Sequence, residues 1–207
     1  ANANFSKINF SGNLIKTTDG LQGLNFCNHL DLSNNRITDI STLADLPAGS
    51  VNQLNLNSNQ IQTIPAGVFS TFQPTNINFS DNPITDWSGI ASHNTLTTFT
   101  CSNDMGAQKS LLNQLPSLRL ISMANQTGNF PDLSNTQINQ VNYKSSNLTD
   151  ISPLADCLNL PVYCGRTSTT NAIIHTLSLS DNQLQDWPHQ QAYNQGKRID
   201  VHNRLDL

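Results

Sequence analysis

The chain has 207 residues, of which 36% are hydrophobic and only 12% are charged, about half the charged share of an ordinary soluble domain. Asn, Gln, Ser and Thr together supply about 40% of the residues, a strong excess over average usage. A net charge of -4 with a regular supply of apolar residues excludes intrinsic disorder, the absence of a basic run argues against nucleic acid as a partner, and no run approaches the ~20 apolar residues that cross a bilayer.

The sequence begins with Ala-Asn-Ala, small residues of the kind that signal-peptidase cleavage leaves. An engineered start would look the same. Together with the low charge and the abundant Asn and Thr, this start favours export, so the expected location is secreted or cell surface.

Apolar residues recur at a fixed spacing along the chain. The pattern LxxLxLxxNxL is met by Cys27, Leu30, Leu32, Asn35 and Ile37, and again by Val51, Leu54, Leu56, Asn59 and Ile61. The first paired apolar residue of each copy is Ile8, Leu30, Leu54, Ile77, Phe99, Ile121, Val141, Leu177 and Ile199. These positions are 20 to 24 residues apart, except for 36 between Val141 and Leu177. The spacing predicts about nine coils.

This motif resembles the leucine-rich repeat family over nearly the whole chain, and residues 37–46 and 148–157 resemble its bacterial, internalin-like subclass of ~22 residues per repeat. The resemblance implies an α/β fold: a right-handed solenoid, curved as a horseshoe, with a parallel sheet on the concave face and short helical or irregular returns on the convex face. Residues 1–207 then form a single domain with an irregular insertion near 157–172.

Side-chain alternation supports this fold independently. In a strand, Leu30 and Leu32 point to one face while Asp31 points to the other, and stacked coils bury the apolar face that a single coil cannot. A side-chain amide that both donates and accepts follows each strand, at Asn13, Asn35, Asn59, Asn82 and Asn182. The ladder is interrupted at Asp104, Gln126, Ser146 and Arg204, which predicts less regular middle coils.

Between strands, Leu111, Leu112 and Leu115 have helical spacing and predict a helix in the return that starts near residue 106. Trp87 and Trp187 occupy matching places after the Asn and are predicted to be core residues.

Cys27 and Cys101 fall at inward positions three coils apart, too far for a disulfide, and are predicted to be buried thiols. Cys157 and Cys164 could form a disulfide in an oxidising compartment. No pair of cysteines has the CxxC spacing of a zinc site, and no metal or other cofactor is expected.

Catalysis requires a nucleophile and base, or two tuned acid and base groups, within hydrogen-bond reach. The five histidines do not cluster; His29 with Asp31 and His202 with Asp200 are the nearest approach to such a pair. Neither a phosphate-binding loop nor a nucleophile elbow is present. We therefore expect no enzymatic activity.

On the predicted open face of the sheet, the N-terminal strands carry small polar side chains and the C-terminal strands carry larger ones. Its central column is Asn9, Asp31, Asn55, Asn78, Thr100, Ser122, Asn142, Ser178 and Asp200. The candidate partner-binding residues lie towards the C-terminus: Arg119, Leu120, Lys144, Tyr163, Arg166, His175, Arg198 and His202. Tyr and Arg are frequent interface anchors, and loops that interrupt a scaffold are often functional. A degenerate coil within 157–172, and charges that only protect a sheet edge, remain the alternatives.

The resemblance implies a recognition module that binds another macromolecule, most often a protein, through the concave sheet. We expect the protein to be non-enzymatic, monomeric and bacterial, and we expect the 157–172 insertion to contribute to binding. A glycan-binding, adhesin-like module is the first alternative, because neutral amides suit hydroxyl groups. A structural or ice-binding polar surface is the second.

Overall fold

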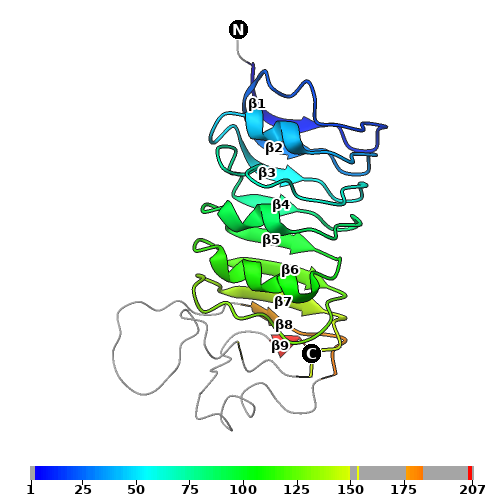
Figure 1. Ribbon diagram of the computed structural model, residues 1–207, viewed down its shortest axis with the longest axis vertical. Helices are drawn as coiled ribbons and strands as arrows, with labels where there is room; N and C mark the ends of the chain where they lie inside the picture. Colours follow the sequence, from blue (N-terminus) through cyan, green and yellow to red (C-terminus); the bar gives the residue numbers. More distant parts are fainter. Residues whose placement is uncertain (1–2, 150–152, 154–175, 184–204, 207) are drawn as a thin grey trace, which may run out of the picture. The chain divides into compact units, whose positions relative to one another are not determined.

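The computed structural model describes residues 3–149, 153, 176–183 and 205–206. The chain divides into two compact units, unit 1 from Ala1 to Asn103 and unit 2 from Asp104 to Leu207. Figure 1 shows that each unit is built from strands that follow one another in chain order, joined by returns that run outside the sheet. The prediction that 1–207 forms a single domain stays a prediction.

Unit 1 contains five parallel strands. They are β1 (Ala3–Asn9), β2 (Leu24–Asp31), β3 (Val51–Asn55), β4 (Asn76–Asn78) and β5 (Thr98–Cys101). The predicted register is confirmed, because Ile8, Leu30, Leu54, Ile77 and Phe99 pair in succession across the strands. A side chain at one repeat position therefore lies beside its equivalents in the neighbouring coils.

The apolar positions of these coils form a continuous core. Leu30, Leu54, Ile77 and Phe99 are all buried, as side-chain alternation predicts. Trp87 lies in this core, with its ring centroid 6.1 Å from that of Phe79 and 5.9 Å from that of Phe99. The prediction that Trp87 is a core residue is confirmed.

The asparagine ladder binds each coil to the one before it. The Asn59 Nδ2 donates to the carbonyls of Leu32 and Leu56, both at 3.0 Å, and its Oδ1 accepts the Ile37 N–H at 3.0 Å. Asn35 and Asn82 make equivalent bonds. The residue before each ladder asparagine has a positive φ, a conformation that is uncommon outside glycine; these residues are Gly12, Asn34, Ser58 and Asp81.

Two of the returns in unit 1 contain short 3₁₀-helices, η1 (Ser41–Asp45) and η2 (Ser88–Ser92). An aspartate lies two residues before each helix: Asp39 Oδ1 accepts the Ser41 N–H at 2.8 Å, and Asp86 Oδ1 accepts the Ser88 N–H at 2.9 Å. Hydrogen bonds from Ser88 lower the pKa of Asp86. The carboxylates thus satisfy amides that a helix start leaves without partners.

Unit 2 repeats the architecture. Its elements are the 3₁₀-helix η3 (Gly106–Gln114) and the parallel strands β6 (Leu120–Ala124), β7 (Gln140–Lys144), β8 (Thr176–Ser178) and β9 (Leu205–Asp206). Ile121 pairs with Val141 and Val141 with Leu177, as predicted. Leu177 then pairs with Leu205 rather than with Ile199. The prediction of Ile199 as the partner of Leu177 is wrong. Leu205 also fits the two-residue alternation, but the usual repeat spacing favoured Ile199.

The predicted helix near residue 106 is present as η3, but as a 3₁₀-helix. Residues three apart eclipse in this geometry, so the buried row is Lys109, Leu112 and Leu115, while Leu111 is only half-buried. The sequence prediction used the spacing of Leu111, Leu112 and Leu115 to predict a helix, and the structure shows that Leu111 is not part of its buried row.

The ladder of unit 2 is irregular, as predicted. Gln126 Oε1 accepts the Met105 N–H at 3.0 Å, and Ser146 Oγ accepts the Gln126 N–H at 3.1 Å. Asn182 restores the usual pattern by donating to the carbonyls of Tyr143 and Leu179. The longer side chain of Gln126 and the shorter one of Ser146 therefore take the place of the ladder asparagine and still form hydrogen bonds with the backbone of the turn.

Both cysteines that lie in the described ranges, Cys27 and Cys101, are buried thiols, as predicted. Cys157, Cys164 and Trp187 lie outside the described residues.

Candidate partner-binding face

The open face of the unit 1 sheet carries a central column of polar side chains in register: Asn9, Asp31, Asn55, Asn78 and Thr100. The first four each accept, through Oδ1, the backbone N–H two residues further on. These bonds come from Ser11 at 2.8 Å, Ser33 at 3.1 Å, Asn57 at 3.2 Å and Ser80 at 3.0 Å. Each side chain is thereby held in one orientation on its strand.

Charge on this face is concentrated on the first two strands. Burial raises the pKa of Asp31, but hydrogen bonds from Ser33 and the nearby His29 and Lys7 outweigh that effect and leave the pKa below its usual value. Asp31 is therefore ionised at neutral pH. The His29 Nε2 is buried and has no hydrogen-bond partner in the part of the chain that the structure describes, so the predicted proximity of His29 and Asp31 gives electrostatic attraction rather than a proton relay.

Three of the eight candidate residues lie in the described part of unit 2, and the structure does not bring them together. Arg119 is exposed and donates to the Gln137 Oε1 at 3.0 Å, just before β6. Leu120 begins β6 opposite Gln140, whereas Lys144 ends β7 opposite Ala124. At ~3.3 Å per residue, four residues separate the two ends by about 13 Å, so these three side chains are not one compact patch.

The other five candidates, Tyr163, Arg166, His175, Arg198 and His202, lie outside the described residues, as does Asp200.

The central column of unit 2 differs from that of unit 1. Asn142 Nδ2 donates to the Ser122 Oγ at 3.3 Å. The Asn142 Oδ1 and the Ser178 Oγ are buried and meet no hydrogen-bond partner within the described ranges, a state that costs about 1–3 kcal/mol for each group. This part of the column is therefore less suited to solvent than its counterpart in unit 1.

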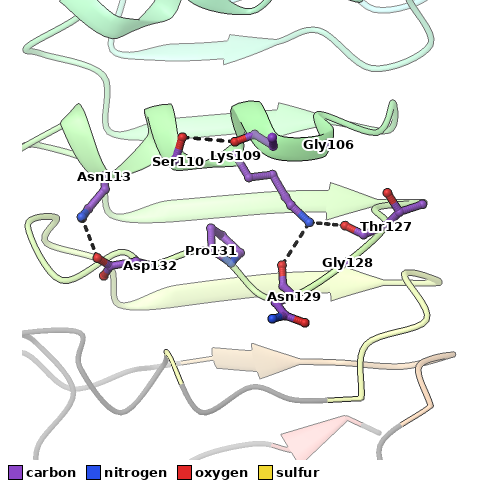
Figure 2. Close-up of a pocket in the computed structure, with 10 residues that line it drawn as sticks. Gly106, Lys109, Ser110, Asn113, Thr127, Gly128, Asn129, Pro131 and Asp132 are labelled. Carbon is purple, nitrogen blue, oxygen red and sulfur yellow. Dashed lines mark hydrogen bonds between the residues drawn. The ribbon is translucent and has the colours of Figure 1, made fainter.

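A pocket of about 460 Å³ lies on the return side of unit 2, between η3 and residues 127–132 (Figure 2). Asn113 Nδ2 donates to the Asp132 Oδ2 at 3.0 Å along one wall. The Lys109 side chain enters from η3, and its Nζ donates to the carbonyls of Thr127 and, at 3.0 Å, Asn129. The ammonium group thus closes part of the pocket and ties η3 to the next coil.

Lys109 is only 6% exposed. Burial lowers its pKa, and the Asp104 carboxylate only partly opposes the shift. Burial in turn raises the pKa of Asp104, but hydrogen bonds from Thr127 and Gly106 and the charge of Lys109 bring it below its usual value. Sequence reasoning missed this cluster; the three-residue spacing of Lys109, Leu112 and Leu115 was the signal that could have indicated it.

No group of three or more metal-ligating side chains is found among the residues that the structure describes. Within the same ranges, no helix is long and apolar enough to cross a membrane.

The comparisons with known proteins agree with this architecture. The leucine-rich repeat family model matches residues 26–46, and no curated protein matches the chain. The crystal structure of internalin C2 from Listeria monocytogenes is similar with a TM-score of 0.65 and 23% identity, over 87% of this chain and 74% of that one. An internalin of the same species, inlF, has a TM-score of 0.44 and 16% identity, over 88% of this chain and 63% of its own. Repeat pattern, parallel register and asparagine ladder together give this chain a leucine-rich repeat solenoid fold, similar to that of internalin C2.

Proposed function

We propose that this chain is a non-enzymatic recognition module of a secreted or cell-surface bacterial protein, and that it binds a partner protein through the open face of its sheet. The observation that carries the proposal is the central column of unit 1, in which successive strands place polar side chains in register on a rigid scaffold. Such a surface can be changed residue by residue without disturbing the core beneath it.

Two further elements belong to the proposal. The segment 157–172, with Tyr163 and Arg166, is a second contact region because of its residue types and its break in the repeat. Arg119, Leu120, Lys144, His175, Arg198 and His202 are peripheral contacts. The chain is proposed to act as a monomer without a cofactor.

A pair of arginine substitutions tests the open face. Thr100 lies in the central column on β5, whereas Thr71 is exposed in a return. Proteins captured from host-cell or envelope extracts by the immobilised chain should be lost with Thr100→Arg and retained with Thr71→Arg. Equal capture by both variants would contradict the proposal.

The second contact region needs its own variant. The double substitution Tyr163→Ala with Arg166→Ala should weaken capture of the same partner at least tenfold. Retention of full binding would remove the 157–172 segment from the site while leaving the open face in place.

A glycan ligand is the second candidate, favoured by the neutral amides and hydroxyls of β3 to β5. It predicts signals on a glycan array that vanish when Asn55 and Asn78 are replaced by alanine. An ice-binding surface would require thermal hysteresis in solution.

A further inference from the structure

We propose that the central column of unit 1 binds an acidic segment of the partner protein, whose carboxylates accept hydrogen bonds from the side-chain amides of Asn9 and Asn78. This inference rests on the proposed function, because it names the partner chemistry for the same open face.

The orientation of these two amides follows from their backbone contacts. The Ser11 N–H lies 2.8 Å from one side-chain atom of Asn9, and the Ser80 N–H lies 3.0 Å from one side-chain atom of Asn78. A backbone N–H can only donate, so the side-chain atom that it contacts must be the amide oxygen. The NH₂ group of each amide is then left to contact a ligand. Neither NH₂ group has an acceptor among the described residues. The column therefore offers donors.

The same column already contains the proposed contact. The Asn55 Nδ2 donates to the Asp31 Oδ1 on the adjacent strand, at 3.1 Å. The Asn55 Oδ1 accepts a backbone N–H two residues further on, as the Oδ1 atoms of Asn9 and Asn78 do. The contact between Asn55 and Asp31 therefore shows that a carboxylate fits against the NH₂ group of an asparagine in this column. Hydrogen bonds to an ionised acceptor are about twice as strong as neutral ones.

The surrounding charges suit an acidic ligand at Asn9. Lys7 lies two residues before Asn9 on β1, on the same face of the strand because side chains alternate. Along the central column of β1 to β5, Asp31 is the one carboxylate, and it is engaged by Asn55, Ser33 and the charges of His29 and Lys7. An uncharged glycan both donates and accepts through its hydroxyls and gains little from donors alone.

The positions of the two amides predict the spacing of the ligand's carboxylates. Asn9 is on β1 and Asn78 on β4, three strand intervals apart, or about 14 Å at ~4.8 Å per strand. An extended peptide covers about 3.4 Å per residue. Two acidic residues about four positions apart would therefore reach both amides.

Asn78→Asp is the decisive variant, because it replaces the donor by a carboxylate of the same shape. Asp31 occupies the equivalent place on β2 and accepts the Ser33 N–H in the same way, so the fold should be unchanged by circular dichroism and thermal midpoint. Asn94→Asp, on an exposed turn before β5, is the control for the added charge.

The probe is a random peptide library displayed on phage and selected on the full chain, with the selected peptides measured by fluorescence anisotropy. We expect peptides with paired acidic residues about four positions apart, weakened at least tenfold by Asn78→Asp and less than twofold by Asn94→Asp. Binders without acidic residues, or equal binding to Asn78→Asp, overturn the inference.

Thr100→Arg separates this inference from the proposed function. Acid-free binders that Thr100→Arg blocks would refute the acidic segment and leave the open face as the site. Binders without acidic residues that Thr100→Arg does not affect, or no peptide binder at all, would refute both.

Discussion

Ladder asparagines hold together backbone groups that water does not reach. Asn59 satisfies three carbonyls, of Leu32, Leu56 and Asn57, and the Ile37 amide, drawn from two successive coils, and it is largely buried. An unsatisfied buried group costs about 1–3 kcal/mol. The ladder was predictable from sequence because this turn places the same amide in each of the regular coils, at Asn35, Asn59, Asn82 and Asn182.

Asn59→Ala should therefore lower the free energy of unfolding by about 3 kcal/mol, measured by urea denaturation, because it removes the side chain that makes all four of these hydrogen bonds. Asn57→Ala is the matched control: Asn57 is half-buried, and its side-chain Oδ1 accepts one bond, from Ser58. This control should change the free energy by less than about 0.5 kcal/mol. Equal losses in the two variants would show that the ladder does not stabilise the stack.

His93 is a titratable group inside the aromatic core, and the sequence analysis did not predict its burial. Its ring is fully buried, and its centroid lies 4.9 Å from that of the Phe69 ring. Burial lowers its pKa from 6.5 to about 4, and the backbone carbonyls of His93 and Pro74 only partly oppose the shift.

The sign of the pH dependence follows from this depressed pKa. The unfolded chain binds a proton near pH 6.5 and the folded chain only near pH 4, so stability is complete above pH 6.5 and falls as the pH is lowered through this window. The free energy of unfolding should drop by about 3 kcal/mol between pH 7 and pH 4 on account of this group.

Urea denaturation at pH 7, 5.5 and 4 checks this prediction. His93→Phe should remove that part of the pH dependence, whereas His29→Gln, on the open face, should retain it. A slope unchanged by His93→Phe would mean that other groups control acid stability.

The return that contains η2 packs closely against the return before it. Gly89 lies in η2, and a Cβ atom at this position would be 2.4 Å from the carbonyl oxygen of Ile64 and 2.5 Å from that of Pro65. Both are backbone atoms of the preceding return, so they cannot move away independently of their coil.

Gly89→Ala should lower the free energy of unfolding by about 3 kcal/mol, the upper end of the cost of overpacking. Gly23→Ala is the control, since nothing lies within 4 Å of its Cβ position; it should be neutral or stabilise the chain by up to about 1 kcal/mol. Thermal melting monitored by circular dichroism separates the two outcomes, and a Gly89→Ala variant as stable as Gly23→Ala would refute this close approach.

Strands were easier to predict than returns, for a physical reason. Two-residue alternation together with a fixed repeat length specifies each strand, and Leu30, Leu54 and Ile77 pair as expected. Leu112 and Leu115 lie on one face of the helix whether its period is 3.0 or 3.6 residues. The sequence therefore could not distinguish a 3₁₀-helix, which buries Lys109 on that face, from an α-helix, which would bury Leu111.

Over the whole molecule, the sequence specifies the scaffold more completely than the ligand. Inward positions must be apolar for the coils to stack, whereas outward positions are free to vary. Arg119, Leu120 and Lys144 were chosen by residue type alone, and they lie at opposite ends of adjacent strands. The donor orientation of Asn9 and Asn78 became visible only when their contacts with Ser11 and Ser80 were known.

The central claim is that the outward side chains of this repeat sheet contact a partner protein. Site-specific photocrosslinking tests it directly, with a benzophenone amino acid in place of Asn76, which faces outward on β4, or in place of Thr71 in a return. The account predicts a covalent partner adduct from position 76 and none from position 71. Crosslinking from position 71 alone would contradict it.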